Sequence, residues 1–138
     1  MVSGGFDPVH TGHIQMIQEA ARWGQVVVVI NSDEWLMRKK GYVFMPYEER
    51  ANILGNIKGV TVVSNVDDSD GTVCEALKRI RPAAFANGGD RKENNTPEMS
   101  LCNELGIHLL WNVGGADKPQ SSSWLVNKAM EQLNGTAK

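Results

Sequence analysis

The chain has 138 residues and a formal net charge of −2. This length fits one domain, residues 1–138, with a single core that needs no disulfides. The weak negative charge excludes a broadly basic surface for nucleic acid, and no apolar run approaches the roughly 18 residues of a membrane span. We expect no signal peptide. The two cysteines, Cys74 and Cys102, form no CxxC pair and indicate reduced thiols in a cytoplasmic protein.

Short apolar runs alternate with helical patterns along the chain. Residues 1–3 match the end of a first strand, and the apolar run within 25–31 fits a strand that is buried on both faces. Further strands are expected at 60–64, 83–86 and 107–111. Helices are expected at 11–23, 33–38, 47–57, 71–80 and 97–105, and a last helix from a serine cap at 121 or 122 to 133, with fraying beyond.

This alternation predicts an α/β domain with a five-stranded parallel sheet and helices on both of its faces. In such sheets, ligands bind at the carboxyl ends of the strands. Three polar segments directly follow strands or begin helices, at 10–13, 87–92 and 121–123. We therefore expect these three segments to meet at one edge of the sheet.

The segment GGFDPVHTGH, from Gly4 to His13, carries the strongest functional signal. It matches a glycine turn that leaves the first strand and enters a helix near Thr11. His10 and His13 are three residues apart and would share one face of the first helical turn. The unpaired N–H groups and the positive end of the helix dipole lie at that same end. The segment predicts an anion site with two imidazole donors, and a nucleotide phosphate is the obvious anion.

The same segment resembles the HxGH signature, commonly G-x-F-D-x-x-H-x-G-H, of the nucleotidylyltransferase superfamily that includes the cytidylyltransferases. Every fixed position of that string is matched here. The resemblance extends over nearly the whole chain and implies a Rossmann-like, three-layer α/β/α fold. It also implies a nucleotide-binding role for the residues around the histidines, which are Gly4, Gly5, Phe6, Asp7 and Gly12.

Positive charges follow the second predicted strand. Lys39 and Lys40 lie in a predicted basic loop, 38–45, where many HxGH enzymes carry a mobile loop that closes on the triphosphate. The alternative is a solvated run of charges. Arg50, in PYEER, resembles the P-x-E-x-R segment of the cytidylyltransferase and heptose-phosphate adenylyltransferase branches, and is expected at a phosphate. The alternative is a surface pair with a glutamate of the same helix.

Gly88, Gly89 and Asp90 resemble the G-G-D turn that follows the fourth strand in heptose-phosphate adenylyltransferases. Two glycines permit a close approach of the backbone to a ligand, and Asp90 would hold the ribose or the base. An ordinary turn at the end of a strand is the alternative. The motif favours the adenylyl branch, whereas the general family resemblance favours the cytidylyl branch.

Ser121, Ser122 and Ser123 resemble the second signature of the family, near I-S-S/T-T, at the start of the last helix. Hydroxyl groups and helix N–H groups there suit the β- and γ-phosphates, and a plain helix cap is the alternative. Glycerol-3-phosphate cytidylyltransferases carry an Arg-Thr before this signature. Its absence here weakens an assignment to that subfamily.

The resemblance implies an enzyme that transfers CMP or AMP, from CTP or ATP, to a phosphorylated sugar or polyol and releases pyrophosphate. The attacking phosphate oxygen is already anionic, so His10, His13, Lys39 and Arg50 would act by positioning and charge neutralisation, with Lys40 binding the nucleotide. Mg²⁺ would enter with the triphosphate, held by phosphates and water, and no protein metal site is predicted. Relatives imply a homodimer. A catalytically inactive nucleotide-binding sensor is the alternative.

Overall fold

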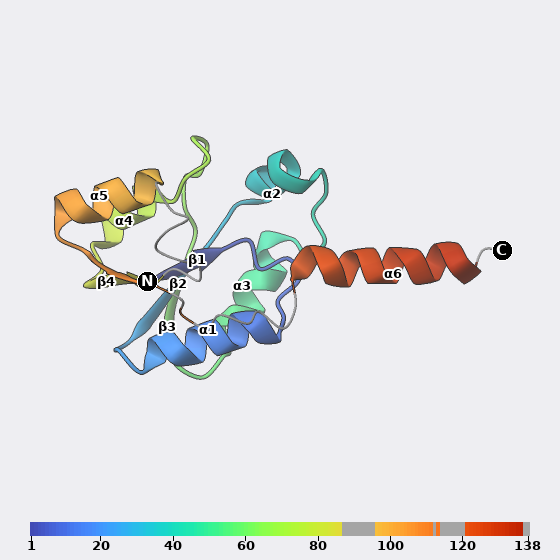
Figure 1. Ribbon diagram of the computed structural model, residues 1–138, viewed down its shortest axis with the longest axis horizontal. Coiled ribbons are helices and arrows are strands. Elements are labelled where there is room, and N and C mark those ends of the chain that lie inside the picture. The colour runs from blue at the N-terminus through green and yellow to red at the C-terminus, as the bar shows by residue number, and fades with distance from the viewer. Residues whose placement is uncertain (87–95, 112, 114–120, 137–138) are drawn as a thin grey trace.

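The computed structural model describes residues 1–86, 96–111, 113 and 121–136 (Figure 1). Strands and helices alternate as the sequence predicts. The strands are β1 (Val2–Gly4), β2 (Val26–Ile30), β3 (Val60–Ser64), β4 (Ala84–Ala86) and β5 (His108–Leu110). The helices are α1 (Thr11–Ala21), α2 (Asp33–Lys40), α3 (Tyr47–Gly55), α4 (Cys74–Ile80), α5 (Pro97–Leu105) and α6 (Ser122–Thr136).

All strand pairs are parallel, but the strands form two sheets. β2 lies between β1 and β3 in a three-stranded sheet, and β4 pairs with β5 in a second one. Met1 joins the two sheets, because its amino group donates to the Ala84 carbonyl at 2.8 Å and its carbonyl accepts from the Ala86 N–H at 2.9 Å. The predicted single five-stranded sheet is therefore wrong. β1 is too short for a continuous ladder with β4, and among the described residues only Met1 bonds across.

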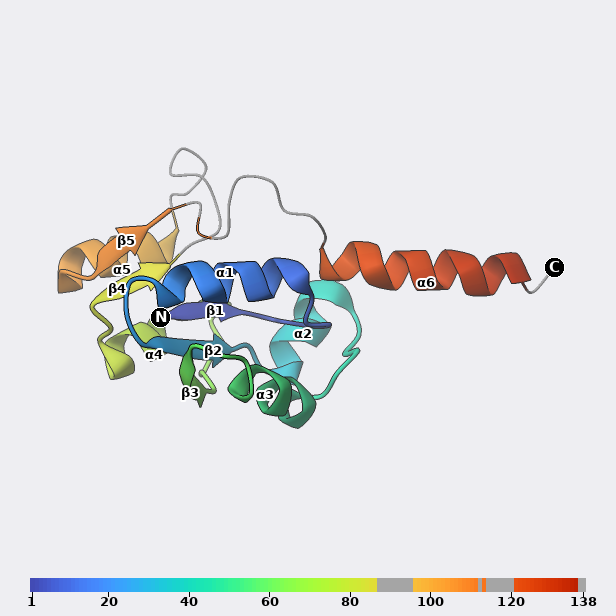
Figure 2. The same cartoon turned by 90° about the horizontal axis from the view of Figure 1, so that it is seen from below.

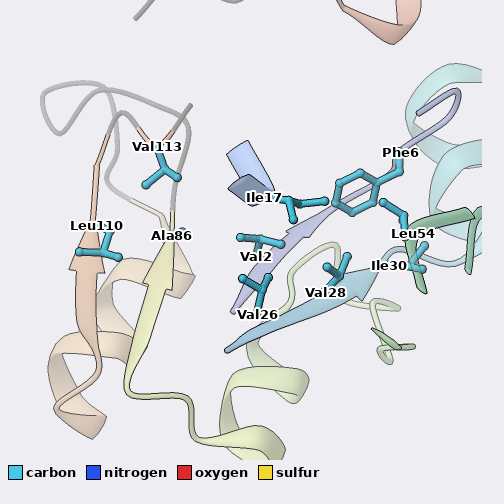
Figure 3. Packing of buried hydrophobic residues seen from close by; sticks show 10 residues of the cluster. All are labelled: Val2, Phe6, Ile17, Val26, Val28, Ile30, Leu54, Ala86, Leu110 and Val113. Atoms are coloured by element: carbon cyan, nitrogen blue, oxygen red, sulfur yellow. The ribbon is translucent and has the colours of Figure 1, made fainter. Parts of the chain in front are cut away.

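Helices cover both faces of the strands, and each face has its own core. Val28 of β2 belongs to a cluster that includes Ile17 of α1 and Leu54 of α3 (Figure 3). Val29, the next residue, belongs to a second cluster with Leu77 of α4 and buried side chains of α5. Because neighbouring residues of a strand point to opposite faces, these two clusters confirm the three-layer α/β/α arrangement of a Rossmann-like fold.

The two cysteines are unpaired thiols. Cys102 is buried on α5 in the second cluster. This burial raises the pKa of its thiol to about 11, with a smaller contribution from Cys74. The Cys102 thiol is therefore protonated at neutral pH and acts as a small packing group.

Two helices end later than the sequence predicts. α2 includes Lys39 and Lys40 in its last turn and ends at Gly41, whose φ of 84° is left-handed, so the predicted basic loop begins only after these lysines. Cations are favourable at a helix C-terminus. α6 continues through Gly135 to Thr136, where fraying was expected, and projects away from the sheets (Figures 1 and 2).

A buried arginine links the carboxyl ends of β1 and β2 to the start of α3. Arg50 is completely buried. Its Nη1 donates to the carbonyls of Gly5 at 2.8 Å and Asn31 at 2.7 Å, and its Nε donates to the Met45 carbonyl at 2.9 Å. Its Nη2 bonds to the Asp33 carboxylate at 2.6 Å. The protein itself occupies four of the five N–H donors of Arg50, so in this structure the guanidinium holds the backbone around it. A contact of Arg50 with phosphate stays a prediction.

We predict that Arg50→Met lowers the free energy of unfolding by about 3–5 kcal/mol, because it leaves three carbonyls and a carboxylate without their donor. Urea denaturation measures this loss. Arg22, which is exposed and pairs only with Glu19 of its own helix in the described structure, provides the control. Arg22→Met should change stability by less than about 0.5 kcal/mol. Equal losses in the two variants would contradict a structural role for the Arg50 guanidinium.

Candidate active site

The glycine turn after β1 is shaped by close packing. A Cβ added to Gly5 would lie 3.0 Å from a methyl group of Leu36 and 3.3 Å from the Trp35 ring, so α2 leaves no room for a side chain. Phe6 follows with a left-handed φ of 52°, which is strained for a residue with a Cβ. Its buried ring lies edge-on to the His13 ring, with 4.8 Å between centroids. This packing fixes the direction in which the chain enters α1.

Asp7 and Lys40 hold the segment between α2 and α3 against this turn. The carboxylate of Asp7 is buried and accepts hydrogen bonds from the backbone N–H groups of Phe44, at 2.8 Å, and Met45. Lys40 Nζ lies 3.4 Å from the same carboxylate and donates to the Asp7 carbonyl at 2.7 Å. Both residues were predicted to bind nucleotide. The structure gives them internal partners that hold the turn in place, and nucleotide binding by either residue stays a prediction.

The two histidines cap the first turn of α1 for each other. His10 Nδ1 accepts from the Gly12 N–H at 3.0 Å, and His13 Nδ1 accepts from the His10 N–H at 3.1 Å. Their rings are stacked with 3.8 Å between centroids. Because each Nδ1 accepts a hydrogen bond, each neutral ring carries its hydrogen on Nε2 and is a donor there. The sequence predicted a shared face for these residues but not this reciprocal capping.

The start of α6 lies beside the start of α1 (Figure 2). The Ser122 hydroxyl donates to the Pro8 carbonyl at 2.8 Å, across 114 positions of sequence. Ser121 Oγ accepts from the Trp124 N–H at 3.1 Å and so caps α6, and Ser123 follows, exposed, in the first turn. The predicted meeting of the histidine and serine segments is confirmed. Two helix N-termini, each with N–H donors and a positive dipole end, therefore adjoin one another.

The remaining predicted residues differ in what the structure shows. Lys39 is exposed on the last turn of α2, with its Nζ 5.5 Å from the centroid of the Trp35 ring. Gly88, Gly89 and Asp90 lie outside the described residues. Asp33, the carboxylate partner of Arg50, was not predicted for the site. Its position directly after a strand was the only feature of the sequence that pointed to the site. The same position is equally typical of an acidic residue in the first turn of a helix.

Neither a protein metal cage nor a membrane span is found in the part of the chain that the structure describes. Its histidines, cysteines, aspartates and glutamates form no group of three or more that could hold a metal ion. None of its helices is long and apolar enough to cross a membrane. In the described residues, the candidate site contains backbone donors, two imidazoles and hydroxyl groups.

Known proteins are similar to this chain in sequence. The bifunctional protein HldE of Gluconobacter oxydans is 34% identical over 107 residues, which are 75% of this chain and 22% of that protein. The FAD synthase of Ferroglobus placidus is 30% identical over 91 residues, or 66% of this chain and 59% of that enzyme. The chain thus spans about a fifth of the length of the HldE relative and somewhat over half of the FAD synthase.

A solved structure supports the fold. The lipopolysaccharide core biosynthesis protein of Thermoplasma volcanium matches with a TM-score of 0.65 and 26% identity, over 80% of this chain and 90% of that one. A family model described as cytidylyltransferase-like matches residues 1–108. The match includes the histidine segment and every strand residue except Leu109 and Leu110 of β5. These findings confirm the resemblance of the GGFDPVHTGH segment. The chain belongs to the cytidylyltransferase-like family.

Proposed function

We propose that this protein is a nucleotidylyltransferase that transfers a nucleoside monophosphate from a nucleoside triphosphate to a phosphorylated sugar or polyol. One observation carries the proposal. The hydrogen bond from Ser122 to Pro8 places a second helix N-terminus beside the one that bears His10 and His13. Two adjoining helix N-termini with imidazole and hydroxyl donors suit a chain of several phosphates better than a single anion.

The reaction follows from these donors. An oxygen of the acceptor phosphate attacks the α-phosphorus, the bond from that phosphorus to the oxygen bridging to the β-phosphate breaks, and pyrophosphate leaves with the electron pair. The attacking oxygen is already an anion, so no base has to remove a proton. His10 and His13 would donate from Nε2 to phosphate oxygens as negative charge builds there, and the first turn of α6 would hold the leaving pyrophosphate.

Mg²⁺ fits this proposal as part of the substrate. The described residues provide no cluster of metal ligands, so an ion that enters with the triphosphate would take its ligands from phosphate oxygens and water. Such an ion supplies charge neutralisation along the phosphate chain. The chain's own residues orient the phosphates at the two helix ends.

The base and the acceptor are tested directly by pyrophosphate release. CTP, ATP, GTP and UTP are each combined with a panel of sugar phosphates and polyol phosphates. We propose CTP or ATP as the donor, and release that requires both a nucleotide and an acceptor supports the transferase. Nucleotide binding without any release would instead identify a catalytically inactive sensor of the same fold.

We predict that His13→Ala lowers kcat by roughly 10²–10³-fold, equivalent to about 3 kcal/mol, because it removes a donor to the transition state. Nucleotide affinity should change far less. Single-turnover kinetics and equilibrium nucleotide binding measure the two effects separately. His108→Ala, which changes an exposed residue of β5, is the control and should leave kcat unchanged. Near-normal turnover in His13→Ala would remove His13 from the mechanism.

We predict that the two lysines of α2 behave differently. Lys39 is exposed and available to an incoming triphosphate, so Lys39→Ala should raise the KM for nucleotide severalfold and leave thermal stability unchanged. Lys40→Ala should lower the melting temperature, because it removes the cation beside the buried carboxylate of Asp7. Lys58, which is exposed just before β3 at the opposite edge of the sheet, serves as the control. Identical effects of Lys39→Ala and Lys58→Ala would exclude a nucleotide contact by Lys39.

We also propose a homodimer, as the family resemblance implies. In the apolar run 42–45, Phe44 is 56% exposed, whereas the other three side chains are half-buried. Phe44 is therefore the main residue of this run that a second subunit could contact. An exposed aromatic side chain favours cover by a second subunit. Light scattering at micromolar protein should report about twice the chain mass, and Phe44→Ser should lower it. A wild-type monomer with full activity would rule out the dimer.

A further inference from the structure

The last helix, α6, leaves the domain with apolar side chains exposed along it. Its first turn is held by the Ser122 hydroxyl, which donates to the Pro8 carbonyl at 2.8 Å. From there the helix projects away from both sheets (Figures 1 and 2). Every residue from 127 to 135 is exposed, and the exposed fractions of Met130 and Leu133 are 52% and 65%. Exposed apolar residues that gather on one face indicate an interaction surface.

The apolar residues of α6 lie on one side of the helix. At about 100° per residue they fall within an arc of about 140°, and they are Leu125, Val126, Ala129, Met130 and Leu133, here called the apolar stripe. The charged residues lie on the other side. Lys128 Nζ is 4.0 Å from the carboxylate of Glu131 and 5.9 Å from the centroid of the Trp124 ring. The helix is therefore amphipathic, and its charges point away from the apolar stripe.

An isolated helix of this length is only marginally stable in water. α6 has 15 residues, and helices of up to about 12–15 residues are marginal alone even when they are rich in alanine. Gly135 lowers the helix propensity further. In proteins, most of the stability of such a helix comes from packing its apolar face. We therefore expect the apolar stripe to be covered in solution.

The spacing of the apolar stripe fits a second copy of the same helix. Four of its residues are separated by three, one and three positions, and they are Val126, Ala129, Met130 and Leu133. This spacing is the same when it is read in either direction. In two antiparallel copies, Val126 can therefore lie opposite the partner's Leu133. Ala129 can likewise lie opposite the partner's Met130, a small residue facing a large one, as a two-fold symmetric contact requires.

The polar residues of α6 also favour a second copy. Ser123, Gln132 and Asn134 border the apolar stripe, and all three are uncharged, so two copies meet without like charges in contact. On the far side, the charges of Lys128 and Glu131 cancel. Helices that bind anionic lipid surfaces are instead rich in lysine and arginine on the polar face. The charge pattern of residues 122–136 thus disfavours a membrane surface as the occupant.

We infer that two copies of this chain associate through the apolar stripes of α6, packed antiparallel about a two-fold axis that is level with Ala129 and Met130. The inference gives the proposed homodimer a contact surface and does not depend on the proposed reaction. A single pair of helices buries less area than a standard interface, so we expect a Kd in the micromolar range. Because α6 begins at Ser122, the pairing also stabilises the helix N-terminus that lies beside Pro8.

Sedimentation equilibrium over about 1–100 μM protein tests the pairing. The mass of the wild-type protein should rise from that of one chain toward that of two. Met130→Glu places a carboxylate in the apolar stripe and should raise the dimer Kd at least about tenfold. Asn127→Glu adds the same group to an exposed position outside the stripe, and as the matched control it should leave the Kd unchanged. Equal Kd values in the two variants would overturn the pairing.

A mixture of two variants tests the antiparallel arrangement. Ala129→Glu and Met130→Lys should each stay monomeric at about 10 μM, because each places an unpaired charge in the contact. Mixed in equal amounts, they should form a dimer of unlike chains, because the added carboxylate of one chain faces the added ammonium of the other. A mixture that stays monomeric would overturn the antiparallel arrangement.

Two other outcomes would assign different contacts. A doubled mass that persists in Met130→Glu and is lost in Phe44→Ser would place the interface at Phe44 and overturn the pairing of α6. A wild-type chain that stays monomeric and sediments with phosphatidylserine vesicles would overturn it in favour of a lipid surface. These measurements do not use catalysis. An absence of pyrophosphate release with every nucleotide would therefore refute the transferase, while a dimer that is lost in Met130→Glu would still support the pairing.

Discussion

The arrangement of the candidate active site depends on one buried cation, the guanidinium of Arg50. The guanidinium of Arg50 holds the backbone at the ends of β1 and β2, and of the segment before α3, in one plane of hydrogen bonds. A buried charge is tolerated only when its donors are satisfied in good geometry. The carbonyls therefore have little freedom to move. Because the Gly5 carbonyl belongs to the glycine turn, the turn is held rigid as well. This fixes the direction in which the chain enters α1.

A second ion pair completes the scaffold from the other side. Met45 donates its N–H to Asp7 and accepts from Arg50 at its carbonyl, so both ion pairs meet at the backbone of one residue. One ion pair, Lys40 with Asp7, thus holds the turn through Asp7, and the other, Arg50 with Asp33, holds it through the Gly5 carbonyl. Two positive side chains near the turn, Lys40 and Arg50, are paired with carboxylates of the protein itself. In the part of the chain that the structure describes, the helix N-termini add positive potential beside the turn, and they need no side-chain ordering to do so.

The sequence predicted most of the elements but not the partners of the charged residues. The bounds of β3 and α5 were predicted correctly because strand and cap signals coincide there, with Thr96 and Gly106 at the two ends of α5. The prediction of a single five-stranded sheet was wrong, because β1 is only three residues long and forms no continuous ladder with β4. Arg50 was predicted at a phosphate but is completely buried, because a motif gives the identity of a residue and not its burial. Its partners Gly5 and Asn31 lie 45 and 19 positions away, beyond the reach of any local pattern.

The contact between Ser122 and Pro8 also constrains the order of assembly. It joins segments 114 positions apart, so nearly the whole described chain lies within the loop that this bond closes. Contacts of such separation form late, because the entropy of closing the loop has to be offset by structure already in place. During synthesis the sheet and α1 can fold while α6 is still on the ribosome. An incomplete chain that lacks α6 would therefore present the histidine pair without the second helix N-terminus.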